Sequence, residues 1–90
     1  RRKTMEKEIR KYLENRKSIV EDAIEVMKNE IDFLERHTAK YIAGEDVDVV
    51  MRKMEAYKEQ VGAKRNILGK LYVRLEEMDN MLIELEKFEK

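Results

Sequence analysis

The chain has 90 residues, of which 44% are charged, and its 20 basic and 20 acidic side chains give a net charge of zero. This balance excludes a general attraction to nucleic acid or to anionic lipid. The absence of cysteine excludes disulfides and thiolate zinc sites. No apolar run approaches the ~20 residues of a membrane span. We therefore expect a cytoplasmic protein with no membrane partner.

Long helices are favoured by the composition, because proline is absent and only three residues are glycine. We expect one domain over residues 1–90, since a chain of this length holds one domain at most. The predominance of Lys and Glu is typical of a thermophilic source. The chain begins with Arg1, so it is either a fragment or a chain whose natural start is Met5.

The first helix is predicted over residues 4–42. Its apolar residues recur every seven positions, which places them along one seam of the helix. They are Leu13, Val20, Met27, Leu34 and Tyr41, with Ile24 and Ile31 at the alternate seam position. Beside the seam runs a second stripe with the same period, formed by Tyr12, Ile19, Val26 and Phe33. One neighbouring helix can cover only one of these two stripes.

A turn is predicted over residues 43–46. Gly44 suits the left-handed position just past a helix end, and Asp46 can accept hydrogen bonds from the first free amides of the next helix. A connection this short makes the two helices antiparallel neighbours. One continuous helix is the alternative, because a glycine inside a helix costs only ~1 kcal/mol.

Blocks of charge favour the hairpin over the continuous helix. Residues 1–17 are basic and residues 74–90 are acidic, whereas residues 21–37 are acidic and residues 52–70 are basic. Folding the chain back at Gly44 sets each basic block against an acidic one, which fixes direction and register. We expect residues whose numbers add to about 90 to face each other.

The second helix is predicted over residues 46–89 and carries the strongest pattern in the chain. Apolar residues follow the alternating steps of three and four that keep them on one face of a helix, as in a coiled coil. The positions are Val47, Val50, Met54, Tyr57, Val61, Lys64, Leu68, Leu71, Leu75, Met78, Leu82 and Leu85. The fold class is therefore all-α: a long antiparallel, coiled-coil-like helical hairpin.

Two such hairpins packed face to face would form a homodimeric four-helix bundle and cover the second stripe. The predicted dimer contact consists of Tyr12, Ile19, Val26, Phe33, Ile67 and Met81. Lys64, the one charged residue in the second seam, is predicted to set register or oligomeric state at some cost in stability. Its ammonium can reach an acidic residue such as Glu25 or Glu30 while its stem packs in the seam.

Catalytic, metal and cofactor sites are not predicted. A metal site in a helical bundle would need Glu three residues before His37, but that position is Leu34, and no second histidine exists. A patch of small residues on the second helix has two interpretations, tolerated glycines or the close approach of another backbone. Its members are Ala56, Gly62, Ala63, Asn66 and Gly69.

The predicted function is a non-enzymatic helical interaction or oligomerisation module, such as an adaptor, a small regulator or a phage or viral accessory protein. Its partner would be a second copy, and another protein could bind through a helical face. A dimeric RNA-binding bundle is the alternative, although the neutral charge makes nucleic acid a poor partner. A small all-helical enzyme is the third reading, and it would need cationic side chains inside the bundle.

Overall fold

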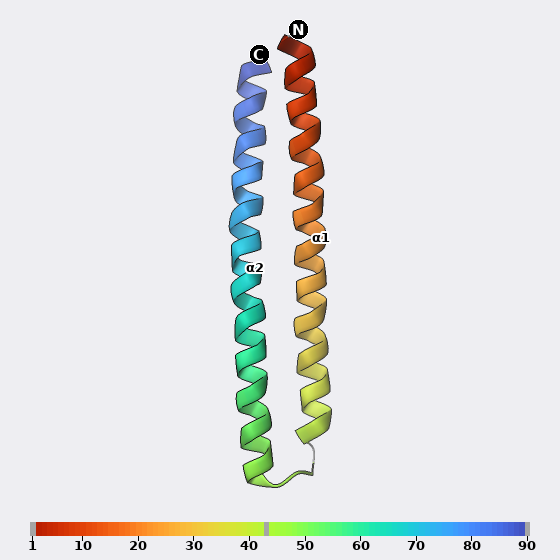
Figure 1. The fold of residues 1–90 in the computed structure, drawn as a ribbon, viewed down its shortest axis with the longest axis vertical. Helices are drawn as coiled ribbons and strands as arrows, with labels where there is room; N and C mark the ends of the chain where they lie inside the picture. Colours follow the sequence, from red (N-terminus) through yellow and green to blue (C-terminus); the bar gives the residue numbers. More distant parts are fainter. Residues whose placement is uncertain (1, 43, 90) are drawn as a thin grey trace. The chain divides into compact units, whose positions relative to one another are not determined.

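The computed structural model of the protein describes residues 2–42 and 44–89, with side chains for residues 5–40, 42 and 44–88 (Figure 1). Helix α1 spans Arg2–Ile42 and helix α2 spans Val47–Glu89, and the two pack as a hairpin. This confirms the all-helical hairpin and shows that the continuous-helix alternative is wrong. Helix α1 begins two residues before its predicted start, and α2 begins one residue after. Positions 1, 43 and 90, which the predicted domain and turn include, lie outside the described residues.

The turn is built around Gly44, whose φ of 78° lies in the left-handed region, as predicted. A side chain there would strain the backbone, so glycine suits this position. The amide of Glu45 donates to the carbonyl of Ile42 over 3.3 Å, and the amide of Val50 donates to the carbonyl of Asp46 over 2.9 Å. The second bond opens α2, and the left-handed backbone of Gly44 allows the chain to reverse before it.

The chain divides into two compact units, each containing a segment of both helices. One comprises Arg1–Ile24 and Lys70–Lys90, and we call it the end unit because both termini belong to it. The other comprises Glu25–Gly69, and we call it the turn unit. Each unit has its own packing and its own ion pairs between the helices, so they are described separately below.

In the end unit, the core is centred on Val20 and Ile24, which are buried. The predicted seam residues of α2 in this unit are half-buried, as a seam between only two helices requires. They are Leu71, Leu75, Met78, Leu82 and Leu85. Lys17 Nζ lies 2.7 Å from Asp79 Oδ1, and Arg10 Nη1 lies 3.7 Å from Glu86 Oε1, so ion pairs link the helices.

In the turn unit, Val61 is the most buried of the described residues, with 3% of its surface exposed. Val47, predicted to be the first seam residue of α2, is instead 72% exposed. The reason is visible in Figure 1, where the first turn of α2 extends beyond the last residues of α1. No part of α1 is therefore level with Val47 to cover it. The side chain of Tyr41, another predicted seam residue, lies outside those described.

This extension of α2 also corrects the predicted register. The ion pairs between the helices join residues whose numbers add to more than 90, as Glu30 with Lys64 and Lys17 with Asp79 show. Each position of α1 therefore faces a residue of α2 roughly one helical turn (~4 residues) nearer the C-terminus than expected. The pairing of opposite charges holds, and Lys64 pairs with Glu30, one of its two predicted partners.

Candidate interaction surface

The second stripe of α1 is an apolar feature that the hairpin leaves uncovered. Tyr12, Ile19, Val26 and Phe33 are each between 54% and 63% exposed. From α2, Ile67 and Met81 are about half exposed, at 47% and 53%. The six residues of the predicted dimer contact are therefore all accessible in the hairpin.

An open groove of about 510 Å³ lies between the helices in the end unit, and we call it the end groove. Its walls are almost entirely apolar, and the polar side chains Asn80 and Glu84 stand at its margin. The apolar lining consists of Ile9, Tyr12, Leu13, Met81, Leu85 and Phe88. The groove thus brings Tyr12 and Met81, two predicted contact residues from different helices, onto one face of the end unit.

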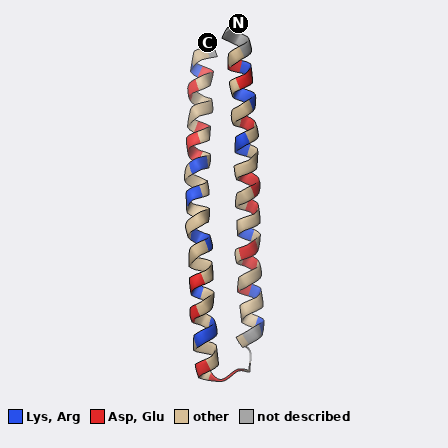
Figure 2. Ribbon diagram, in the orientation of Figure 1, with Lys and Arg blue, Asp and Glu red and all other residues tan. Residues whose placement is uncertain are grey.

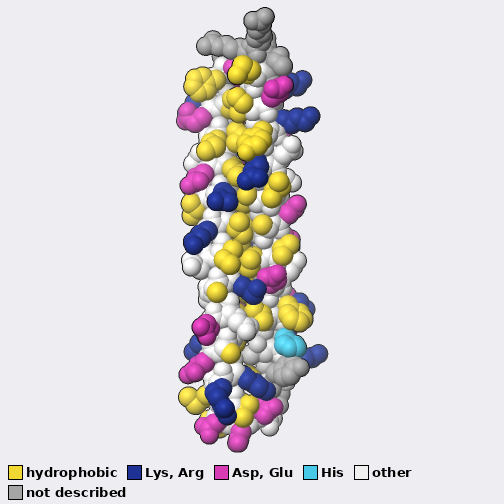
Figure 3. Space-filling model, viewed as in Figure 1, with side chains coloured by type: hydrophobic (Ala, Val, Ile, Leu, Met, Phe, Trp, Pro, Cys, Tyr) yellow, Lys and Arg dark blue, Asp and Glu magenta, His cyan; other side chains and the backbone are white. Residues whose placement is uncertain are grey.

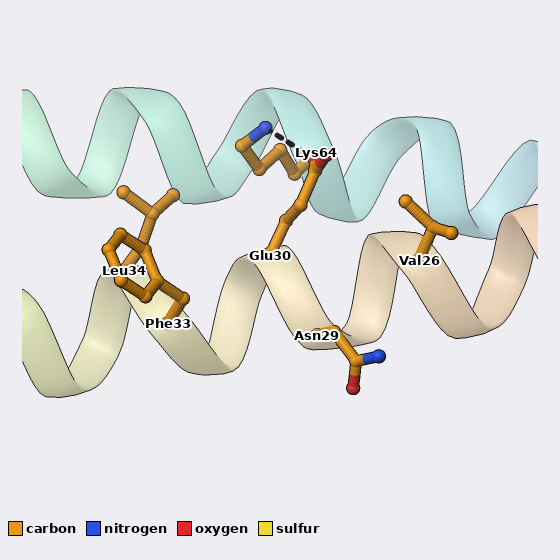
Figure 4. Close-up of a pocket in the computed structure, with 6 residues that line it drawn as sticks. All are labelled: Val26, Asn29, Glu30, Phe33, Leu34 and Lys64. Carbon is orange, nitrogen blue, oxygen red and sulfur yellow. Dashed lines mark hydrogen bonds and ion pairs between the residues drawn. The ribbon is translucent and has the colours of Figure 1, made fainter.

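A second groove, of about 390 Å³, lies in the turn unit and is lined by Val26, Phe33 and Leu34 from α1 (Figure 4). Figure 4 shows the Lys64 side chain of α2 directed toward Glu30 of α1. The Lys64 Nζ and Glu30 Oε2 atoms are 2.8 Å apart, which is the ion pair expected for a seam lysine. Whether Lys64 also sets the oligomeric state stays a prediction.

Nearer the turn, a third groove of about 240 Å³ is lined by both polar and apolar side chains, and we call it the turn groove. The residues around it are Leu34, His37, Thr38, Lys53, Ala56, Tyr57 and Gln60. The His37 ring stacks on the Phe33 ring with centroids 5.3 Å apart. Among the described residues, no three His, Asp or Glu side chains form a group that could hold a metal ion. The stacked ring is a packing contact.

Two ionisable side chains in the seam have shifted pKa values. Burial, followed by the negative charge of Glu35, raises the pKa of Tyr57 above its ordinary value. A hydrogen bond to Asp79, followed by the charge of that carboxylate, raises the pKa of Lys17. Both shifts favour the protonated form. At neutral pH, Tyr57 is therefore a neutral hydroxyl and Lys17 an ammonium, so neither is activated as a base or nucleophile.

Two members of the predicted small-residue patch have open space around them in the hairpin. Gly62 and Gly69 are both exposed, and apart from the neighbouring backbone of α2 no described atom lies within 4 Å of the place where a Cβ would stand on either. Ala56 belongs to the lining of the turn groove. The packing of the hairpin therefore does not require glycine at positions 62 and 69, and the approach of another backbone there stays a prediction.

Replacing Lys64 with leucine is expected to raise the free energy of unfolding by roughly 1 kcal/mol, because leucine adds apolar burial to the seam. Glu30, which is half exposed, keeps its hydration after the change. Urea unfolding followed by circular dichroism measures the effect. The matched variant Lys58→Leu changes an exposed residue of the same helix and should leave stability nearly unchanged. Loss of stability in Lys64→Leu would mean that the ion pair stabilises the seam.

Sequence reasoning identified the exposed stripe but not the end groove, because Ile9 and Phe88 come from opposite ends of the chain and meet only through the register. The available signal was spacing along each helix: Ile9 lies three residues before Tyr12, and Phe88 lies seven residues after Met81. Within the described helices, no segment has the length and apolar character needed to cross a membrane. Comparisons of the chain with protein-family models, with curated proteins and with solved structures gave no match.

Proposed function

We propose that the protein is a non-enzymatic helical interaction module that works as a homodimer, in which two hairpins form a four-helix bundle. The observation that carries this proposal is the exposed stripe of Tyr12, Ile19, Val26 and Phe33 on α1. Exposed apolar surface that is continuous over several helical turns is typical of interaction sites. A second helix pair laid on this face would bury it in the way that bundles bury their cores.

The amount of uncovered surface supports a large interface. The chain exposes 7539 Å², whereas a compact monomer of its mass would expose about 5,600 Å². Only three of the described residues, Val20, Ile24 and Val61, are buried apolar side chains. The excess of about 1,900 Å² is more than the ~800 Å² that each partner contributes to an interface of standard size. A single hairpin therefore has enough exposed area to contribute one side of a standard interface.

A second copy suits this surface because the net charge of the chain is zero, so two copies do not repel each other. Opposite charges also recur along both helices, as Figure 2 shows. In the bundle, the polar outer faces would remain free, and an adaptor or regulatory role would use them to contact another protein.

RNA binding is a weaker alternative, because basic side chains of the N-terminal block are already engaged. Lys17 pairs with Asp79, and Arg10 pairs with Glu86. A phosphate would have to compete with these carboxylates for each cation. A helical partner would cover the exposed apolar surface, whereas RNA binding gives no reason for that surface.

Sedimentation equilibrium at tens of micromolar is expected to give twice the 10.9 kDa of one chain. Because association and folding are linked, the melting temperature should rise with protein concentration. A monomeric mass combined with melting that is independent of concentration would contradict the homodimer, and the stripe would then serve a different protein partner.

A further inference from the structure

A second patch of exposed apolar side chains lies on α2 within the end unit. Tyr72 is 43% exposed and Ile83 is 52% exposed. They stand eleven residues apart, which is close to three helical turns, so both lie on the same face of α2. Both are outside the lining of the end groove and outside the predicted dimer contact. The proposed homodimer therefore gives no reason for this patch.

Carboxylates occupy the same face of α2 between these two apolar residues. Glu76 and Asp79 fill the stripe from Tyr72 to Ile83 in steps of four, three and four residues, which keeps all of its members on one side of a helix. Asp79 Oδ1 lies 2.7 Å from Lys17 Nζ of α1. The ion pair shows that this stripe adjoins α1.

Two further carboxylates of α1 lie around the same ammonium. Glu14 precedes Lys17 by three residues and Glu21 follows it by four, so all three share a face of α1, and both glutamates are exposed. The hydrogen bond to Asp79 and the charge of that carboxylate raise the pKa of Lys17, and the charges of Glu21 and Glu14 raise it further. Three carboxylates thus surround one cation.

We call this surface of the end unit the acidic face. Its residues are Glu14, Lys17 and Glu21 of α1 and Tyr72, Glu76, Asp79 and Ile83 of α2. Lys11, three residues before Glu14, marks its limit toward the termini. In Figure 3, acidic and basic side chains are interspersed over the visible face of the molecule. A local excess of one sign is therefore the exception.

The excess of negative charge limits what can bind to the acidic face. Phosphate groups of nucleic acid or lipid would be repelled, and so would the acidic face of a second copy. Among the described residues, no three acidic or histidine side chains are grouped closely enough to hold a metal ion. The carboxylates are spread over several helical turns and alternate with apolar side chains. A partner that matches them carries both cationic and apolar groups over the same length.

We propose that the acidic face docks a cationic amphipathic helix of another protein. The apolar stripe of that helix would pack on Tyr72 and Ile83, and its flanking Lys and Arg side chains would pair with Glu14, Glu21 and Glu76. This inference rests on the proposed interaction role and adds the class of partner. It does not need the homodimer, because the whole acidic face lies within one end unit.

A synthetic amphipathic helix of leucine and lysine, carrying a fluorophore, is the probe, and fluorescence anisotropy measures its binding. Ile83→Ala is expected to raise the dissociation constant roughly 10-fold, because it removes apolar surface from the contact. Val73→Ala is the matched control. Val73 is 56% exposed on the same helix, one residue after Tyr72 and hence about 100° round the helix axis from it. Both residues are exposed, so both variants should keep the helical circular dichroism signal of the wild type.

The contribution of charge is tested by replacing two carboxylates. Glu14→Gln combined with Glu21→Gln should weaken the probe by roughly 3- to 10-fold, and added salt should reduce this difference. Glu55→Gln combined with Glu59→Gln removes the same charge from exposed residues of the turn unit and should leave the affinity nearly unchanged. A peptide with glutamate in place of lysine should not bind.

Three results would overturn the docking proposal: no binding of the leucine–lysine probe, equal affinities of Ile83→Ala and Val73→Ala, or equal binding of the glutamate peptide. Sedimentation equilibrium of the chain without peptide reports on the homodimer separately. A monomeric chain whose binding of the probe is weakened by Ile83→Ala would contradict the homodimer and support the acidic face as a docking site.

Discussion

The Val61→Asp variant is expected to lose about 3–5 kcal/mol of stability, enough to unfold the hairpin under conditions in which the wild type is folded. Val61 is only 3% exposed and lies at the centre of packing in the turn unit. A carboxylate at this position would be removed from water inside an apolar seam. The helical circular dichroism signal and its midpoint in urea measure the loss.

Val73→Asp is the matched control, because it makes the same substitution on the same helix. Val73 is 56% exposed, so its replacement should change the free energy of unfolding by less than about 0.5 kcal/mol. Helix propensity and the added charge change equally in the two variants. The difference between their free energies of unfolding therefore measures the effect of burial. Equal stability of the two variants would contradict the assignment of Val61 to the core.

The Phe33→Asp variant is expected to shift the protein from dimer to monomer, with a dissociation constant raised roughly 100-fold, or about 3 kcal/mol. Phe33 is 60% exposed in the single hairpin, so an aspartate there remains hydrated until a second copy covers it. Sedimentation equilibrium over a range of concentrations measures the shift. Melting should also begin at a lower temperature, because the free energy of association is lost.

Ser18→Asp provides the control for added charge, since Ser18 is an exposed residue of α1 that lies away from the apolar stripe. This variant should remain a dimer with the wild-type dissociation constant. If Phe33→Asp also stayed fully dimeric, the interface would lie on another face of the hairpin. If both variants dissociated equally, the effect would come from net charge and not from the stripe.

The seam was predictable from the sequence because the spacing of apolar residues determines which of them share a helical face. Val61 and Ile24 are buried where that spacing places them, and Gly44 adopts the left-handed turn. The register was not predictable to better than about one turn. It depends on how far α2 extends past α1 at the turn, and the exposure of Val47 follows from that extension.

The uncertainty in the register between the helices also limited the prediction of the candidate surface. Lys64 had two acidic candidates, Glu25 and Glu30, and only the register selects Glu30 as its partner. The stripe from Tyr12 to Phe33 follows from periodicity within one helix. It could therefore be predicted without knowing how the two helices are aligned. The end groove, which joins Ile9 to Phe88, required the positions of both helices to be known.

The ion pairs also reveal how unevenly chain entropy opposes folding along the hairpin. The Lys53–Glu45 pair beside the turn joins residues eight positions apart, whereas Arg10 and Glu86 are separated by a roughly tenfold longer stretch of chain. Loop-closure entropy grows with the logarithm of that length, so closing the end unit directly costs on the order of 2 kcal/mol more than closing the turn. The hairpin is therefore expected to zip from Gly44 outward. A second copy bound in the end groove would stabilise the segment that is entropically the most expensive to close.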